Sequence, residues 1–276
     1  MGRIVVGVDG SPPADRALRW AVREARMRSS AVEIVHCFVQ HRTGPVTRAQ
    51  EHQLAETRLD AITTRNRDVL DCVKWSAATT AVGAVPSSGV IAAAVDAELL
   101  VVGARGAEGF HRLRLGSTGY RTAARSPVPV AVISADGGRP EEMDAQRPLV
   151  VGVDGSPAAH RALLWAVDEA RRRSVTLTIA HAYQPTVPAT PEAAAAARHA
   201  AEAIVRGLEH DTAGDRVTVE TVVVRGTPAG SLLELSGSDH LLVIGTRGGG
   251  LLTDMPFGSV SHQCLHHACG PTVIVP

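Results

Sequence analysis

The sequence predicts an α/β protein of two tandem domains, each an open five-stranded parallel sheet. The chain repeats itself: VVGVDGSP stands at 5–12 and again at 150–157, and RALRWAVREARMRS at 16–29 corresponds to RALLWAVDEARRRS at 161–174. In each half, short apolar runs alternate with amphipathic helical patterns, which indicates a parallel sheet. This repeat is far longer than the roughly 20–50 residues of a solenoid unit. A whole domain is therefore duplicated, and a site in one half should have a counterpart in the other.

The first half opens with an apolar run that predicts a strand at 3–8. Pro12 and Pro13 suit the start of the helix that we expect up to Arg28. The same alternation predicts the remaining elements in chain order: a strand at 31–38, a long helix from Thr47 to Leu70, a strand at 74–82, a short helix at 87–95, a strand at 98–103, a helix at 117–125 and a strand at 128–133.

The second half repeats this order. Its alanine run at 193–197 follows Pro191 and predicts a helix, because alanine is the best helix former. The strands of both halves are rich in Val, Ile and Leu with little alternation, as expected of strands buried on both faces. We expect strands at 149–153, 175–182, 217–224, 240–245 and 271–275, and helices at 158–173, 191–210, 228–236 and 259–268.

The segment 134–147 is polar, contains Gly and Pro, and has no periodicity, which is typical of a linker. A chain of 276 residues is long enough for two ordinary domains. We therefore expect the first domain at 1–134, the linker at 135–147 and the second domain at 148–276.

The bulk composition excludes several classes of protein. Lys+Arg and Asp+Glu both number 28, so the formal net charge is zero. Broad electrostatic binding to nucleic acid or to an anionic membrane is therefore not expected. The first strand leaves no room for a signal peptide, and no apolar run approaches a membrane span, so we expect a cytoplasmic protein. Lys74 is the only lysine, so phosphate contacts would come from backbone N–H groups, hydroxyls and arginine.

Ligands of open α/β sheets bind at the carboxyl ends of the strands. Asp9 and Asp154 follow the first strand of each half, where they could accept hydrogen bonds from an adenine edge or a ribose hydroxyl. The alternative is that each aspartate merely caps the next helix. Spacing alone leaves both interpretations open.

A second shared pattern, Gly-x2-Gly-x9-Gly-Ser, begins at Gly103 and at Gly245. Its first glycines allow close approach of backbone to a ligand or a positive φ. The Gly-Ser pairs, at 116–117 and 258–259, open a helix whose N–H groups and dipole favour an anion. The alternative is a serine N-cap with glycines serving only turns. Two copies with identical spacing, each paired with an aspartate, favour the anion site.

Together these motifs resemble those of tandem universal stress proteins of the nucleotide-binding type. The resemblance is carried by both VVGVDGSP segments, by GARG-x9-GST at 103–118 and by GTRG-x9-GSV at 245–260. It covers both halves and implies an adenine-nucleotide α-hydrolase-like, Rossmann-like fold. It also implies an ATP-binding regulator of the stress response that is not a dedicated enzyme, although weak ATP hydrolysis is compatible with it.

The resemblance also implies the residues that hold ATP. The strand-one aspartates and glycines lie against the nucleoside, the residues after His36 and His181 meet the adenine, and the glycine-rich pattern holds ribose and phosphates. In the first half these residues are Gly7, Asp9, Cys37, Gly103, Arg105, Gly106, Gly116, Ser117 and Thr118. In the second half they are Gly152, Asp154, Ala182, Gly245, Arg247, Gly248, Gly249, Gly258, Ser259 and Val260. No residue is assigned as catalytic or as a resident metal ligand.

The two copies differ between the glycines. The first places Glu108 near the expected phosphates, where Arg112 and Arg114 could balance its charge, and has Gly119 in the first turn of the next helix. The second has three consecutive glycines at 248–250 and Asp254, which could face a Mg ion that bridges phosphates. We expect the second site to be the stronger.

Further features admit simpler explanations. His262 and His266 have the i,i+4 spacing of zinc sites, but packing and surface histidines explain the cluster more simply. The four cysteines suggest no disulfide framework. Trp20 and Trp165 occupy matching helix positions and are expected to anchor packing. The last strands are short, apolar and expected at sheet edges, which tend to be covered or paired. The resemblance implies that such edges pair between domains, so we expect the halves to dock and two chains to form a homodimer.

Two other functions stay open. One is an ATPase or nucleotidyl-transfer enzyme that uses the same pocket, although no general base or phosphate lysine is visible. The other is a scaffold that binds no nucleotide. The sequence names no protein partner and no particular stress.

Overall fold

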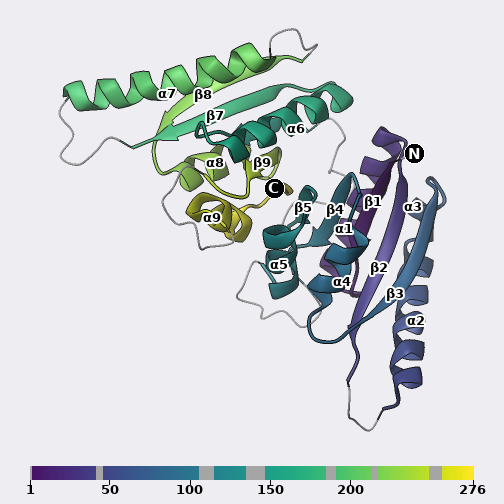
Figure 1. Ribbon diagram of the computed structural model, residues 1–276. Coiled ribbons are helices and arrows are strands. Elements are labelled where there is room, and N and C mark those ends of the chain that lie inside the picture. Colours follow the sequence, from purple (N-terminus) through teal and green to yellow (C-terminus); the bar gives the residue numbers. More distant parts are fainter. Residues whose placement is uncertain are drawn as a thin grey trace. The chain divides into compact units, whose positions relative to one another are not determined.

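The computed structural model describes residues 2–41, 46–105, 115–134, 147–184, 191–212, 217–248 and 257–276. The chain divides into two compact units, Met1–Ala145 and Gln146–Pro276, called the first and second half below. Each is a parallel sheet of five strands with helices on both faces (Figure 1). The predicted tandem α/β fold is confirmed.

In the first half, the predicted helix over 47–70 is divided at Asn66. This residue is buried, and its side-chain amide donates to the Ile62 carbonyl oxygen at 3.0 Å and to Asp15 on the preceding helix at 3.1 Å. A side chain that bonds to the backbone in this way competes with helix continuation. The elements are β1 Arg3–Gly7, α1 Pro12–Arg28, β2 Ala31–Val39, α2 Arg48–Arg65, α3 Arg67–Leu70, β3 Trp75–Val82, α4 Pro86–Ala93, β4 Leu99–Gly103, α5 Ser117–Arg125 and β5 Val130–Ile133.

In the second half, the alanine run lies in a helix as predicted, and Pro157 stands at the start of another. The elements are β6 Leu149–Gly152, α6 Pro157–Arg173, β7 Leu177–Tyr183, α7 Pro191–Thr212, β8 Val219–Arg225, α8 Pro228–Ser236, β9 Leu241–Gly245, α9 Ser259–His267 and β10 Thr272–Val275.

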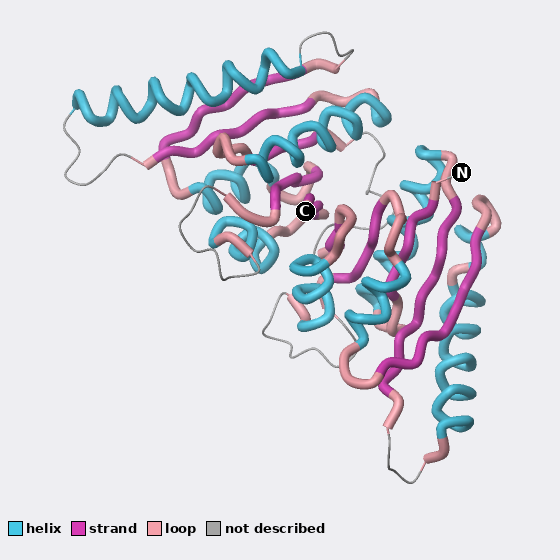
Figure 2. The backbone as a smooth tube through the Cα atoms, viewed as in Figure 1, coloured by secondary structure: helices cyan, strands magenta, loops and turns pink. Residues whose placement is uncertain are grey.

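The strands of each half follow the order of a doubly wound sheet. The first half runs β3-β2-β1-β4-β5 and the second β8-β7-β6-β9-β10, with parallel pairing throughout the described ladders (Figure 2). The direction of winding reverses between β1 and β4, and between β6 and β9. Such a switch point leaves a crevice beyond the carboxyl ends of its two strands, where ligands bind.

The core is formed by these strands together with one face of each covering helix. Ile4, Val5 and Val6 of β1 are all buried, which confirms a strand covered on both sides. Trp20 is buried within α1, and Trp165 of α6 is partly buried. Of the expected linker at 135–147, all but Arg147 lies outside the described residues. No helix in the described ranges is long and apolar enough to cross a membrane.

Candidate functional site

The turn after the first strand has the same construction in both halves. Gly155 adopts a φ of +79°, which a residue with a side chain rarely adopts. Asp154 Oδ1 accepts the Ser156 N–H at 3.0 Å. The Ser156 hydroxyl, in turn, accepts the Ala159 N–H at 3.2 Å and is the N-cap of α6. The aspartate therefore shapes the turn, and the serine caps the helix.

Asp9 makes the equivalent turn in the first half. Its Oδ1 accepts the Ser11 N–H at 3.0 Å and the Ser11 hydroxyl at 2.6 Å. Ser11 is the N-cap of α1. The interpretation of Asp9 and Asp154 as helix caps is thus wrong, because a serine two residues later has that role in each half.

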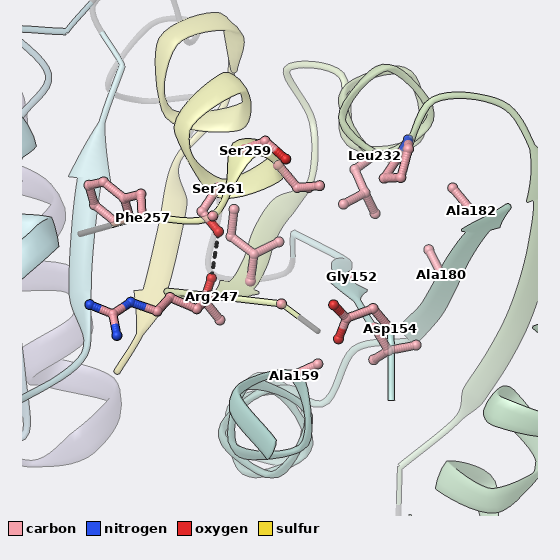
Figure 3. A pocket seen from close by; sticks show the side chains of 17 residues that line it. Gly152, Asp154, Ala159, Ala180, Ala182, Leu232, Arg247, Phe257, Ser259 and Ser261 are labelled. Carbon is pink, nitrogen blue, oxygen red and sulfur yellow. Dashed lines mark hydrogen bonds between the residues drawn. The ribbon is translucent and has the colours of Figure 1, made fainter. Parts of the chain in front are cut away.

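A cavity of about 370 Å³ opens at the switch point of the second half (Figure 3). Its volume falls within the range of roughly 300–1,000 Å³ that is typical of small-molecule sites. The structure brings together in it every described residue that we predicted for this half; Gly249 lies outside the described residues. These residues are Gly152, Asp154, Ala182, Gly245, Arg247, Gly248, Gly258, Ser259 and Val260.

The sequence did not single out the rest of the lining, most of which is apolar. Six of these residues come from strands and helices that only the fold brings together, whereas Val153 and Phe257 lie outside the helices and strands. The whole set is Val153, Ala159, Ala180, Pro228, Leu232, Ile244, Phe257 and Ser261.

The cavity is apolar at one end and polar at the other. Ala180 and Ala182 of β7 lie with Leu232 of α8 at one side, whereas Ser259 lies at the start of α9 (Figure 3). Asp154 lies in the lower part of this view, below Ala180 and Ser259 alike. The arrangement offers an apolar surface, a carboxylate and a helix start to a single ligand.

The start of α9 is suited to an anion. Its N-cap is Gly258, so no side chain caps the helix, in contrast to the serine-capped α6. The first N–H groups of a helix lack partners within the helix, and its dipole attracts negative charge. The exposed Ser259 adds a hydroxyl at the same place. Gly116 leaves α5 of the first half uncapped in the same way.

The glycines at the ends of β4 and β9 serve the fold. A Cβ on Gly245 would stand 2.8 Å from the backbone carbonyl group of Ala158, and one on Gly103 would stand 2.9 Å from that of Pro13. Neither glycine has a positive φ. We expected these positions to approach a ligand or to need a positive φ. The positive φ is absent, and both glycines allow close packing against the first turn of α6 or α1; Gly245 also lines the cavity, so its approach to a ligand stays a prediction.

Two other glycines of the second half bring site elements together. A Cβ on Gly152 would lie 2.6 Å from Leu232, so this glycine admits the α8 side chain that lines the cavity. A Cβ on Gly248 would collide with Asp154 Oδ2. The glycine-rich pattern and the strand-one aspartate are therefore direct neighbours.

A histidine bonds to the residue before the aspartate in each half; His36 is buried and His181 is partly buried. His36 Nδ1 lies 2.8 Å from the carbonyl oxygen of Val8, the residue before Asp9. His181 Nδ1 lies 2.7 Å from the carbonyl oxygen of Val153, the residue before Asp154. Burial lowers the pKa of His36, outweighing the opposite effect of the bond to Val8. The sequence showed both histidines at matching positions, but we assigned them no role.

In the first half, the predicted residues stand at the same places in the topology. Gly7 ends β1 and Asp9 follows it, Cys37 lies in β2, and Gly103 ends β4 with Arg105 two residues later. Gly116 is the N-cap of α5, which begins with Ser117 and Thr118. Burial raises the pKa of the Cys37 thiol to about 11, so it stays protonated at neutral pH. Gly106, Glu108, Arg112, Arg114 and, in the second half, Asp254 lie outside the described residues.

The histidine cluster of α9 brings two rings together. The centroids of His262 and His266 are 4.6 Å apart, and desolvation followed by the charges of His262 and His267 lowers the pKa of His266. Within the described ranges, no group of three or more His, Cys, Asp or Glu side chains is arranged to hold a metal ion.

A solved structure that covers both halves shares this fold. A universal stress protein from Archaeoglobus fulgidus DSM 4304 aligns with 99% of this chain and 97% of its own, at a TM-score of 0.76 and 18% identity. A structure of an A. fulgidus universal stress protein in complex with dAMP aligns with 48% of this chain and 97% of its own, at a TM-score of 0.38 and 26% identity.

The sequence comparisons extend over both halves. Residues 1–134 and 146–276 each match the model of the universal stress protein family. A universal stress protein of Mycolicibacterium smegmatis is 31% identical over 286 residues, covering 99% of this chain and 96% of that protein. One from Mycobacterium tuberculosis is 32% identical over 284 residues, covering 98% and 96%. The chain therefore belongs to the universal stress protein family.

Proposed function

We propose that this protein is a regulator of the stress response that binds ATP in the cavity of its second half. One observation carries the proposal: a single cavity joins apolar side chains, a carboxylate and an uncapped helix start. A nucleotide has the matching parts: an apolar base, a hydroxyl-bearing sugar and anionic phosphates. The stress-response role rests on family membership.

Each end of the cavity has a part in this proposal. Ala182 and Leu232 contact the base, and Asp154 accepts a hydrogen bond from the sugar or the base edge. The N–H groups that follow Gly258, with the Ser259 hydroxyl, hold the phosphates. Arg247 adds positive charge beside them, in the absence of any lysine in this segment. Magnesium would act as a counterion of the phosphates.

We propose binding with at most slow hydrolysis. Among the described residues that line the cavity, Asp154 is the only carboxylate, and none is histidine or lysine. The Oδ1 atom of Asp154 already accepts the Ser156 N–H, and its Oδ2 atom lies against Gly248. An enzyme with fast turnover needs a positioned base with access to the attacking water.

Calorimetric titration of the full chain with ATP, with and without magnesium, tests the proposal. We expect saturable binding that Asp154→Ala weakens, because the variant loses the hydrogen bond to the nucleoside. Asp168→Ala is the matched control, since Asp168 lies on the exposed face of α6 and outside the cavity lining. No heat with ATP under either condition would contradict binding. Steady release of ADP would instead favour an enzyme.

A further inference from the structure

The strand beside the cavity leaves its regular pairing at one point. Gly152 of β6 pairs with Ala180 of β7, whose carbonyl oxygen accepts the Val153 N–H at 2.9 Å. In a regular parallel ladder, the next bond would run from the Ala182 N–H to the Val153 carbonyl oxygen. Between the described residues of this turn that bond is not formed: β6 ends at Gly152, whereas β7 continues to Tyr183.

A side chain takes the place of the missing backbone bond. The Val153 carbonyl oxygen lies 2.7 Å from His181 Nδ1. A carbonyl oxygen can only accept a hydrogen bond, so Nδ1 carries the proton and donates it. The ring lies outside the cavity lining, as expected of a residue that alternates along β7 with Ala180 and Ala182. His181 therefore satisfies the carbonyl group that the Ala182 N–H would otherwise bind.

The backbone of Ala182 is directed towards the cavity. The N–H and C=O groups that face one neighbouring strand belong to every second residue. Ala180 bonds to Val153 on the β6 side, whereas the Tyr183 carbonyl oxygen accepts the Gly226 N–H at 3.0 Å on the β8 side. Ala182 thus faces the β6 side, beyond the end of β6. It lines the cavity there and is partly exposed (Figure 3).

The first half has the same arrangement. The Val35 carbonyl oxygen accepts the Val8 N–H at 2.9 Å, and β1 ends at Gly7. His36 Nδ1 lies 2.8 Å from the Val8 carbonyl oxygen. In this described turn, too, no bond runs from the Cys37 N–H to Val8. A histidine ring therefore ends the ladder at matching positions in both copies of the domain.

The histidine also fixes the backbone that leads to the aspartate. β7 holds the Val153 N–H through the Ala180 carbonyl oxygen and the Val153 carbonyl oxygen through His181. Both peptide groups of Val153 are thus tied to β7. The second of these peptide groups joins Val153 to Asp154, whose side chain lines the cavity.

We propose that His181 is a positioning residue of the ligand site. By replacing Ala182 in the bond to Val153, its ring leaves the Ala182 N–H available to a ring nitrogen of the base, while Asp154 is held at the cavity. Without the imidazole, the Ala182 N–H would close the ladder onto Val153 and be lost to the ligand. This inference rests on the proposed function, since it concerns how that site meets the base.

Amide hydrogen exchange of the full chain, followed by NMR, tests the backbone part of the inference. In the ligand-free wild type, the Ala182 N–H should exchange faster than the Ala180 N–H, which lies within the ladder. Adenosine should slow the exchange at Ala182. In His181→Leu, exchange at Ala182 should be slow before any ligand is added, because the amide then bonds to Val153.

Titration with adenosine and with inorganic tripolyphosphate tests the ligand part, because each probe carries one end of a nucleotide. His181→Leu should weaken adenosine about fivefold, the effect of one lost hydrogen bond, and leave tripolyphosphate unchanged. His181→Asn should keep the wild-type affinity, since its amide N–H stands as many bonds from the backbone as Nδ1 does. Ile179→Ala is the control: it removes buried packing from the same face of β7 and should leave adenosine affinity unchanged.

Three results would each overturn the inference alone. They are a slowly exchanging Ala182 N–H in the ligand-free wild type, unchanged adenosine affinity in a folded His181→Leu, and equal losses of affinity in His181→Asn and His181→Leu. If circular dichroism shows that His181→Leu does not fold, wild-type exchange and the affinity of His181→Asn decide the question. A wild type that binds neither ATP nor adenosine would overturn the proposed function as well.

Discussion

Arg173 donates from Nε to Glu169 Oε1 across 2.7 Å in the interior of the second half, where the two side chains are only 3% and 2% exposed. Arg28 and Glu24 form the equivalent pair in the first half, with Nε and Oε2 3.6 Å apart and similarly deep burial. A buried charge without its partner retains the full cost of removal from water. The pair in each half is therefore a point at which single substitutions act strongly.

We predict that Arg173→Leu lowers the free energy of unfolding of the second half by about 3–5 kcal/mol, because the buried Glu169 carboxylate loses the positive charge of Arg173. The double variant Arg173→Leu/Glu169→Leu should recover most of the loss. Arg171→Leu is the control, since Arg171 pairs with Asp168 at the surface, where a bridge contributes about 0–1 kcal/mol. Urea unfolding measures all three. Equal losses in the single and double variants would show that the charge pairing is irrelevant.

Glycine substitutions should distinguish a glycine that the fold requires from one that lies only at the site. Gly245→Ala places a Cβ 2.8 Å from the Ala158 backbone and should lower the free energy of unfolding by about 1–3 kcal/mol. Gly258→Ala meets its nearest atom at 3.4 Å with a φ of −68°, so its thermal unfolding midpoint should stay close to that of the wild type. Similar midpoints for both variants would contradict the role given to Gly245.

The two serines of the first turn of α9 should behave differently. Ser261 is buried and donates its hydroxyl to the Gly245 carbonyl oxygen at 2.7 Å. Ser261→Ala should therefore lower the free energy of unfolding by about 1–3 kcal/mol. Ser259 is exposed, so Ser259→Ala should leave unfolding unchanged. Denaturant unfolding of both variants checks this, and a stable Ser261→Ala would refute the structural role of that bond.

His36 should make the first half sensitive to acid. Its pKa is lowered by burial below the ordinary value of 6.5, so the folded state resists a proton that the unfolded state accepts. The contribution of neutral His36 to the free energy of unfolding is therefore complete above about pH 6.5. It is lost as the pH falls through the pKa of the folded state. We predict that His36→Gln reduces the fall in unfolding free energy between pH 7 and pH 5.

Val35→Ala is the control for this experiment, because it destabilises the same strand without removing a titratable group. It should keep the wild-type dependence on pH. Chemical denaturation at several pH values measures both variants, and an unchanged slope in His36→Gln would rule out the histidine as the source.

Much of the fold follows from local sequence. Runs such as Leu99–Gly103 are apolar throughout and short, so their burial as parallel strands was predictable. The break at Asn66 was not, because it depends on Asp15, a contact between helices that lie far apart in the sequence. The roles in the turn after β6 were likewise not predictable, because they depend on side-chain geometry. That geometry makes Ser156, and not Asp154, the N-cap of α6.

The site was predictable where it depends on motifs. Gly248 and Ser259 belong to a repeated pattern, and the structure places both at the cavity. Leu232 and Ile244 were missed because apolar side chains carry no chemical signal, and only the packing of α8 and β9 brings them there. The ATP contacts of these residues, the first-half site and the association of two chains stay predictions.

The close packing of Gly245 on Ala158 also affects how this protein can diverge. It anchors the end of β9 to α6 just before the nine residues that separate Gly248 from Gly258. Those residues share little with their counterparts in the first half, while the flanking glycines are the same in both copies. Duplication thus left the chain with two segments of equal length and different sequence between matching glycines, in which the ligand preferences of the two halves can diverge.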